Sequence, residues 1–223
     1  MAVIHHTTMQ PTKLELLAAW LPTRTWYAGG AEEPRPAKAG GFRLDDPAGE
    51  VGVEFMAVTD GAGPDAVTHL VPMTYRGAPL EGAEHALIGT SEHGVLGTRW
   101  IYDGAHDPVL VAQLYALFAG RAEAQHQSVD DTTDPTVSAS LAAAGTGAEL
   151  VRVTEGPDRT DVEVRETGAD APLTLRLRRV LRPGTDDAPG RGRVTAEWRR
   201  PDGTTARGAY AVALAGQGPL RPS

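Results

Sequence analysis

Residues 51–75 decide the fold, and their sequence is VGVEFMAVTDGAGPDAVTHLVPMTY. Apolar side chains alternate with other residues over 51–57 and again over 67–75, which is the period of a β-strand. The dipeptides DG and GP between the two runs are typical of a turn. Pro72 lacks an amide hydrogen, so it indicates an edge or a bulge in the second strand. The stretch therefore predicts an antiparallel strand pair.

Two helical patterns flank this pair along the chain. Over 13–21 the apolar residues recur at helical spacing, with Thr12 as a candidate N-cap and Pro22 as a stop. A second helix is predicted from Asp107-Pro108 to Gly120. A capping side chain followed by proline favours a first helical turn, and glycine favours a helix end.

The rest of the first half completes a sheet. Residues 29–41 are rich in glycine, proline and alanine and are predicted to form a loop, whereas 86–90 and 95–102 are predicted strands. The fold expected for residues 1–125 is α+β, with helices packed on an antiparallel sheet.

The second half has a different texture. The segment QHQSVDDTTDP is polar and without apolar periodicity, so we predict a linker over 126–135. Beyond it we predict a small β-rich domain over 136–216 and a tail over 217–223. Its strands are expected at 150–153, 162–164, 173–177, 194–198 and 210–214, with a hairpin turn at Pro201-Asp202-Gly203.

Composition restricts the classes of function. The formal charge of −8 disfavours non-specific binding to nucleic acid or to an anionic membrane, because both need cationic partners. The absence of cysteine excludes disulfides, thiolate metal sites and cysteine nucleophiles. No long apolar run or signal-peptide pattern is present, so a cytoplasmic protein without a membrane span is expected.

Several long segments of the first half carry a resemblance. They are GGFRLDDPAGEVGVEFM, LVPMTYRGAPLEGAE, ALIGTSEHGVLGTRWIYDG and HDPVLVAQLYALFAG. This half resembles the N-terminal cap-like domain of bacterial maltokinases and related sugar kinases of the aminoglycoside-phosphotransferase type. The resemblance implies a cystatin-like topology and an association with a sugar kinase.

The residues of a kinase site are missing. Phosphoryl transfer of the protein-kinase type needs a strand lysine for the nucleotide phosphates and acidic and asparagine ligands for magnesium. The chain has no asparagine, and its two lysines are Lys13 and Lys38. In the run LRLRR, Arg176 stands where the resemblance implies a nucleotide-contacting lysine, so the second half is either a degenerate kinase lobe or an unrelated β domain. We expect no catalytic residue, no cofactor and no metal ligand.

Other polar groups give weak signals. None of the seven histidines forms an HExxH or H-x3-H pattern, and His5-His6 would point to opposite faces of a strand. The pairs Asp45-Asp46 and Asp186-Asp187 are expected in solvated turns. The run AGTGA at 144–148 lacks the rest of a phosphate-binding loop.

Four aromatic residues are the candidate interaction site. Trp26 and Tyr27 follow the first helix, and Trp100 and Tyr102 share one face of a predicted strand. Core packing between helix and sheet is one interpretation, and an exposed patch for sugar or protein contact is the other.

These observations lead to a functional hypothesis with alternatives. We expect a stand-alone, non-catalytic cap-like protein that contacts a sugar kinase or another enzyme of trehalose, maltose or glycogen metabolism, or that self-associates. A small-molecule or glucan-binding module using the aromatic cluster is the alternative. A third possibility is an enzyme with an unrecognised site.

Overall fold

The protein is mostly β. The computed structural model describes residues 9–30, 33–127, 132–169, 171–184 and 190–216. Strands make up 48% of the structure and helices 15%. Within the described residues there are two α-helices and one antiparallel sheet of 13 strands. The α+β prediction is therefore wrong, because the strands of the second half extend the sheet of the first and the helices cover only parts of it.

The elements of the first half lie close to the predicted positions. Residues 37–41 are the exception, since they begin a strand where a loop was expected. The elements are β1 (Met9–Gln10), α1 (Lys13–Trp20), η1 (Leu21–Thr23), β2 (Ala37–Leu44), β3 (Gly52–Asp60), η2 (Gly63–Asp65), β4 (Val67–Arg76), η3 (Glu84–Ala86), β5 (Leu87–His93), β6 (Gly97–Asp103), η4 (Gly104–His106) and α2 (Pro108–Phe118).

The second half contributes strands alone. All five predicted runs fall in strands, and the hairpin turn at 201–203 is confirmed between the last two. The elements are β7 (Gln125–His126), β8 (Ser138–Leu141), β9 (Ala148–Glu155), β10 (Arg159–Glu166), β11 (Leu173–Arg178), β12 (Gly192–Arg199) and β13 (Thr205–Ala215).

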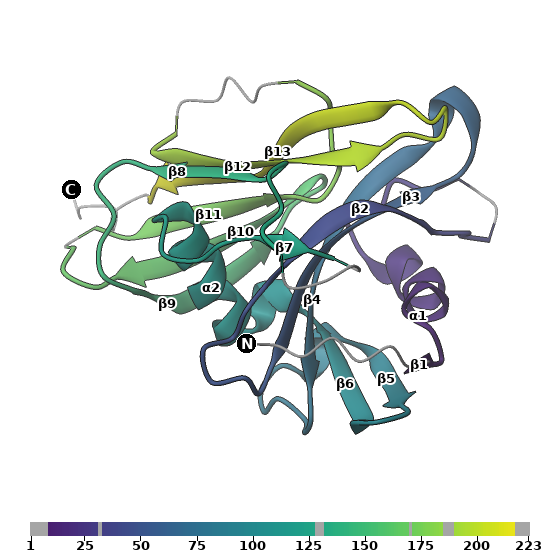
Figure 1. Cartoon of the computed structure of the whole chain (residues 1–223), viewed down its shortest axis with the longest axis horizontal. Coiled ribbons are helices and arrows are strands. Elements are labelled where there is room, and N and C mark those ends of the chain that lie inside the picture. Colours follow the sequence, from purple (N-terminus) through teal and green to yellow (C-terminus); the bar gives the residue numbers. More distant parts are fainter. Residues whose placement is uncertain (1–8, 31–32, 128–131, 170, 185–189, 217–223) are drawn as a thin grey trace, which may run out of the picture.

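The sheet runs through both halves of the chain and curls. Its order is β1-β5-β6-β4-β3-β2-β12-β13-β11-β10-β9, with β7 paired to β2 and β8 to β12. In Figure 1, β2 lies between the strands of the two halves. The curl brings β4 to the segment that follows β11: the Leu70 amide donates to the Arg179 carbonyl at 3.0 Å, and the Leu181 amide to the Thr68 carbonyl at 2.8 Å.

Pro72 marks the point where β4 changes its neighbour. Its partner across β3 is Phe55, and the β3–β4 register is unbroken there, so neither an edge strand nor a bulge in this pair is found. On the other side of β4, Leu70 bonds to the segment after β11, whereas Met73 begins the pairing with β6. Pro72, which has no amide hydrogen to donate, therefore lies between the part of β4 that bonds to the segment after β11 and the part that pairs with β6.

Strand β2 bends where the two halves of the sheet meet. Gly41 has a φ of +125°, and a Cβ there would lie 2.0 Å from the carbonyl oxygen of Phe55. Its neighbour Gly40 pairs with Trp198 of β12, the register point that joins β2 to β12. Only glycine fits such a close approach of two backbones without strain.

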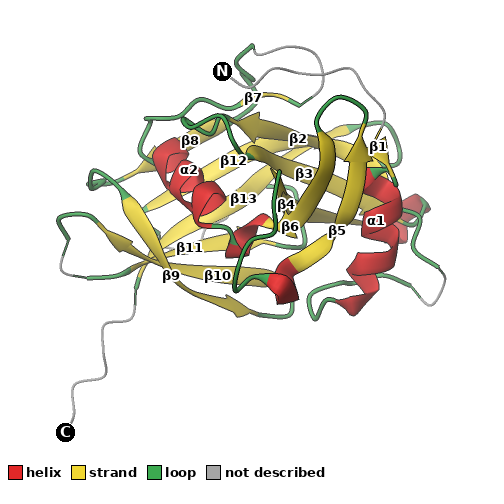
Figure 2. Ribbon diagram, turned by 90° about the horizontal axis from the view of Figure 1, so that it is seen from below, coloured by secondary structure: helices red, strands yellow, loops and turns green. Residues whose placement is uncertain are grey.

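Two large hydrophobic clusters lie on the two faces of β3. Val53, Phe55 and Ala57 belong to a cluster that continues through α2 to the strands of the second half, including Leu175. Met56 and Val58 belong to a second cluster, which is completed by α1 and β4. Because both faces of β3 are buried, its sequence is almost continuously apolar. Figure 2 shows α1 and α2 at opposite ends of the sheet.

Both helices begin as the sequence predicts. At α1 the Thr12 hydroxyl accepts from the Glu15 amide, and the Glu15 carboxylate accepts from the Thr12 amide, which is a capping box. At α2 the Asp107 carboxylate accepts from the Val109 amide at 2.9 Å, with Pro108 in the first turn. Asp107 is also held by Arg76 through two bonds, of 2.6 and 2.7 Å.

The predicted linker is partly tied to the fold. Residues 128–131 and the predicted tail 217–223 lie outside the described residues, as do His5-His6 and Asp186-Asp187. Next to the gap, His126 pairs with Phe42 of β2, and the Asp134 amide donates to the Ala124 carbonyl at 2.8 Å. The division into domains at 126–135 stays a prediction.

Candidate functional site

A buried ion pair lies where the two halves of the chain meet. Arg179 follows β11, is fully buried, and its Nη2 bonds to Oδ2 of the buried Asp103 at the end of β6 at 2.5 Å. Its Nε donates to the Thr160 hydroxyl at 2.7 Å, and its guanidinium lies 4.6 Å from the ring centroid of Trp26. A buried charge needs partners of this kind, because leaving it unpaired costs several kcal/mol.

A buried histidine lies beside this pair. The His69 ring packs against Trp26 and Tyr27, at centroid distances of 5.9 and 5.3 Å. Neither ring nitrogen has a hydrogen-bond partner of normal geometry among the described residues. Burial lowers the pKa of His69 to about 4, against the opposing effects of the Arg179 backbone and Asp60. His69 is therefore neutral at pH 7.

A pair of histidines lies at the end of β6. His106 of η4 and His85 of η3 approach to 3.1 Å between Nδ1 and Nε2, with their rings nearly perpendicular. His106 is half-buried, and burial lowers its pKa. One donor atom each of Asp103, His106 and Glu155 lies within 4.8 Å of the other two. The Thr25 hydroxyl donates to Oε2 of Glu155 at 3.1 Å.

A separate cluster surrounds Glu54 on the α1 side of β3. The buried Glu54 carboxylate accepts from Nζ of Lys13 at 2.8 Å, from Nε2 of Gln127 at 2.7 Å and from the Tyr75 hydroxyl. Burial alone would raise the pKa of Glu54, but Lys13, Tyr75 and Lys38 together lower it below its usual value. The two lysines of the chain are thus both associated with one carboxylate.

Arg176, which stands where the resemblance implies a nucleotide-contacting lysine, is also paired with a carboxylate. Its Nε and Nη2 donate to the two oxygens of Asp161 on β10 at 2.6 and 2.8 Å. The two residues are direct cross-strand partners in the β10–β11 pair. Arg176 therefore sits in a two-bond pair with a carboxylate of its own sheet, a geometry that arginine favours.

The four aromatic candidates do not form one exposed patch. Trp26 and Tyr102 are buried, and Tyr27 and Trp100 are half-buried. Trp26 and Tyr27 lie in the second hydrophobic cluster, the one completed by α1 and β4, and the Tyr27 hydroxyl donates to Asp60. Trp100 and Tyr102 share a smaller cluster, in which the Tyr102 hydroxyl accepts from the Leu80 amide at 2.9 Å. The core-packing interpretation fits these positions.

We call Asp103, His106, His69, Arg179 and Glu155 together the polar site. The sequence analysis missed two of its members, Arg179 and Glu155. No burial was predicted for Arg179, yet Leu173, Leu175, Leu177, Arg179 and Leu181 are the buried alternate residues of one run. This period of two was the available signal for burial. Glu155 gave no signal, because its neighbours Asp103 and His106 are about fifty residues away in the sequence. Asp46 is also buried rather than solvated, although it does accept from local amides as expected.

A comparison with known families finds a match within the first half of the chain. Residues 20–107 match the maltokinase N-terminal cap domain. The match confirms the resemblance, and it covers β2 to β6 and η4 but somewhat less than half of the chain. No curated protein gives a significant match.

The cap-like domain holds only part of the polar site. Asp103, His106 and His69 fall inside the matched residues, whereas Arg179 and Glu155 come from the second half. All four aromatic candidates are also inside the match. None of the described helices is long and apolar enough to cross a membrane.

Proposed function

We propose that this chain is a non-catalytic accessory protein, whose maltokinase cap-like domain contacts a sugar kinase or another enzyme of maltose, trehalose or glycogen metabolism. The link to this metabolism rests on the match to the maltokinase N-terminal cap domain. The observation that carries the non-catalytic part is the placement of the cations. Lys13 is bound to Glu54 and Arg176 to Asp161, so neither is positioned to receive nucleotide phosphates.

The contact surface in this proposal is the tip of the β5–β6 hairpin. Val95 and Leu96 are 62% and 45% exposed there, and they are two of the three large apolar side chains exposed among the described residues. They are adjacent and lie inside the cap-like domain. Burying such a pair against a partner removes apolar surface from water, which favours binding.

The glucan-binding alternative has no such support. A sugar platform needs exposed aromatic faces. Trp26 and Tyr102 are buried, and the rings of Tyr27 and Trp100 are partly covered by their own clusters.

Two experiments test the proposal. The purified protein should give no maltose- or glucosamine-dependent ADP release from ATP and magnesium above a heat-treated control. Mixed with a purified maltokinase, it should form a complex detectable by sedimentation or native mass spectrometry.

Variants locate the contact. Val95→Asp combined with Leu96→Asp should weaken the complex by at least about tenfold, which corresponds to about 1.4 kcal/mol. Val151→Asp is the matched control, because Val151 is 47% exposed on β9 and lies outside the cap-like domain. Sugar-dependent ADP release would overturn the non-catalytic part. Failure to bind any sugar kinase or glucan-metabolising enzyme would overturn the partner.

A further inference from the structure

Three potential ligand groups for a metal ion converge where the halves of the chain meet. Asp103 ends β6, His106 ends η4, and Glu155 ends β9. One donor atom of each lies within 4.8 Å of the other two. Around an ion with bonds of about 2.1 Å, tetrahedral ligand atoms lie about 3.4 Å apart, so binding would draw the three donor atoms together by up to about 1.4 Å.

Each of these groups has an outer partner that fixes its orientation. Asp103 is held by Arg179 through Oδ2, and its Oδ1 accepts from the Ala105 amide at 3.2 Å. His106 is held by His85, and Glu155 by Thr25. Hydrogen bonds from outer partners commonly orient metal ligands in proteins.

The partners leave lone pairs available for an ion. An ionised carboxylate has about four lone-pair sites, so Asp103 keeps capacity beside its two existing bonds. When Nδ1 of His106 engages His85, its Nε2 is left as a possible ligand atom. Two carboxylates against the single charge of Arg179 leave the group anionic, which favours a cation.

We propose that Asp103, His106 and Glu155 bind one divalent transition metal ion, with Zn²⁺ the best match to an imidazole and two carboxylates. Three protein ligands leave a position for water, as in open zinc sites. Two of the ligands belong to the cap-like domain and one to the second half, so the ion ties the two parts together. Imidazole disfavours Mg²⁺ and Ca²⁺, which take oxygen ligands.

Calorimetric titration of the full chain with Zn²⁺ tests the site. We expect one ion per chain with a micromolar dissociation constant, a rise in Tm on binding, and no comparable binding of Mg²⁺. His106→Gln and Glu155→Gln should each weaken binding by at least about tenfold. Titration with Co²⁺ should give visible absorption bands of low coordination number that both variants reduce.

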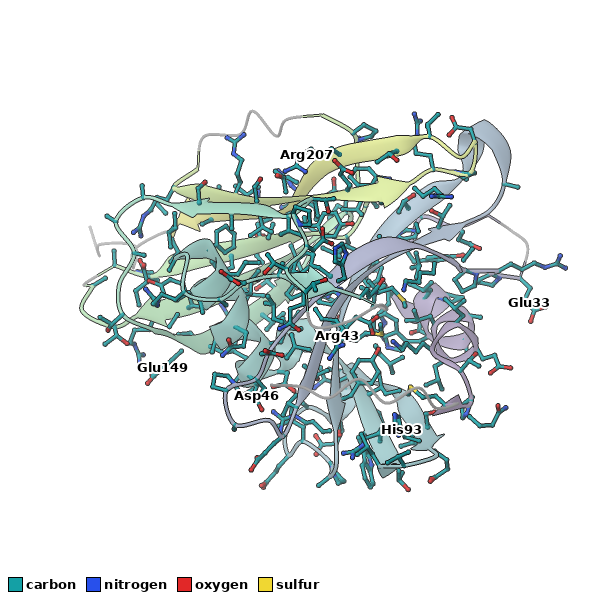
Figure 3. All side chains as sticks on the ribbon, in the orientation of Figure 1. Glu33, Arg43, Asp46, His93, Glu149 and Arg207 are labelled. Atoms are coloured by element: carbon teal, nitrogen blue, oxygen red, sulfur yellow. The ribbon has the colours of Figure 1, made fainter. Side chains whose placement is uncertain are left out.

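Two controls separate this site from adventitious binding. Glu149→Gln removes a carboxylate from the same strand, but Glu149 is 77% exposed and points outward at the edge of the molecule (Figure 3), so binding should not change. His5→Gln combined with His6→Gln should leave the tight site intact. Binding only in the millimolar range, wild-type affinity in both site variants, or loss of the tight site with His5 and His6 would overturn the proposal.

Discussion

Arg179 is a fully buried arginine that donates hydrogen bonds from each of its three nitrogens inside the fold. It has no exposure, and it joins Asp103 of β6 to Thr160 of β10 while stacking on Trp26. Lysine could not replace it, because a single ammonium group cannot reproduce the planar fork that reaches several acceptors. The burial of this residue therefore depends on a particular arrangement of strands from both halves.

Replacing Arg179 should be strongly destabilising. Arg179→Met leaves the Asp103 carboxylate buried without its counter-charge, and we expect the free energy of unfolding to fall by about 3–5 kcal/mol. Asp103→Asn removes that charge but keeps an oxygen for the Ala105 amide. The double variant should therefore be more stable than Arg179→Met alone. Urea unfolding measures all three, and a loss below about 1 kcal/mol in Arg179→Met would contradict the argument.

His69 should make stability depend on pH. Its pKa is about 4 in the fold and about 6.5 when unfolded, so the unfolded chain takes up the proton first as the pH falls. Protonation of His69 alone should lower the free energy of unfolding by up to about 3 kcal/mol between pH 6.5 and 4. The nearby Asp60, Tyr27 and Arg179 contribute separately. His69→Leu should lose less over that window. Equal pH profiles for the two proteins would show that His69 is not the cause.

At the scale of elements, most of the sequence predictions were sound. Periodicity, caps and turn dipeptides are local, so they located α1, α2 and the strand pairs. The beginning of β2 was missed because KAGGF contains two glycines, which are typical of loops. Those glycines are required by a contact with β3 and β12, and a contact between distant segments has no local signal.

Gly41 is the position at which this contact can be tested. Gly41→Ala places a methyl group 2.0 Å from a backbone oxygen at a φ of +125°, so either β2 or β3 must move. We expect a loss of at least about 2 kcal/mol in the free energy of unfolding. Gly30→Ala is the control, since a Cβ there meets nothing within 4 Å. Similar urea midpoints for the two variants would mean that the bend in β2 tolerates a side chain.

At the scale of the whole molecule, the predicted architecture was wrong although most of its strands and helices were predicted correctly. Each half was predicted with suitable strands, but the pairing of Gly40 with Trp198 and of β4 with the segment after β11 joins them into one sheet. Such pairings depend on side chains far apart in sequence. The polar site was not predicted for the same reason, because Asp103, Arg179 and Glu155 are brought together only by the curl of the sheet.

The shared core leads to a prediction about cooperativity. Leu175 of the second half lies in the same cluster as Val53 and Phe55 of the first, so its loss should weaken both halves. Trp20, Trp26 and Trp100 report on the first half when Trp198 is replaced by phenylalanine. In that background, Leu175→Ala should lower the urea midpoint of the tryptophan fluorescence, by an amount equivalent to about 2–5 kcal/mol.

An exposed valine serves as the control for Leu175→Ala. Val151→Ala, at an exposed position on β9, should leave the midpoint nearly unchanged. If residues 126–135 instead separate two independent domains, Leu175→Ala will leave the fluorescence transition of the first half where it was. A fragment of residues 1–125 would then also unfold cooperatively on its own. If the chain unfolds as one cooperative unit, calorimetry and fluorescence should each show a single unfolding transition, because all parts of the core are lost together. Leu175→Ala should then shift that transition in both measurements.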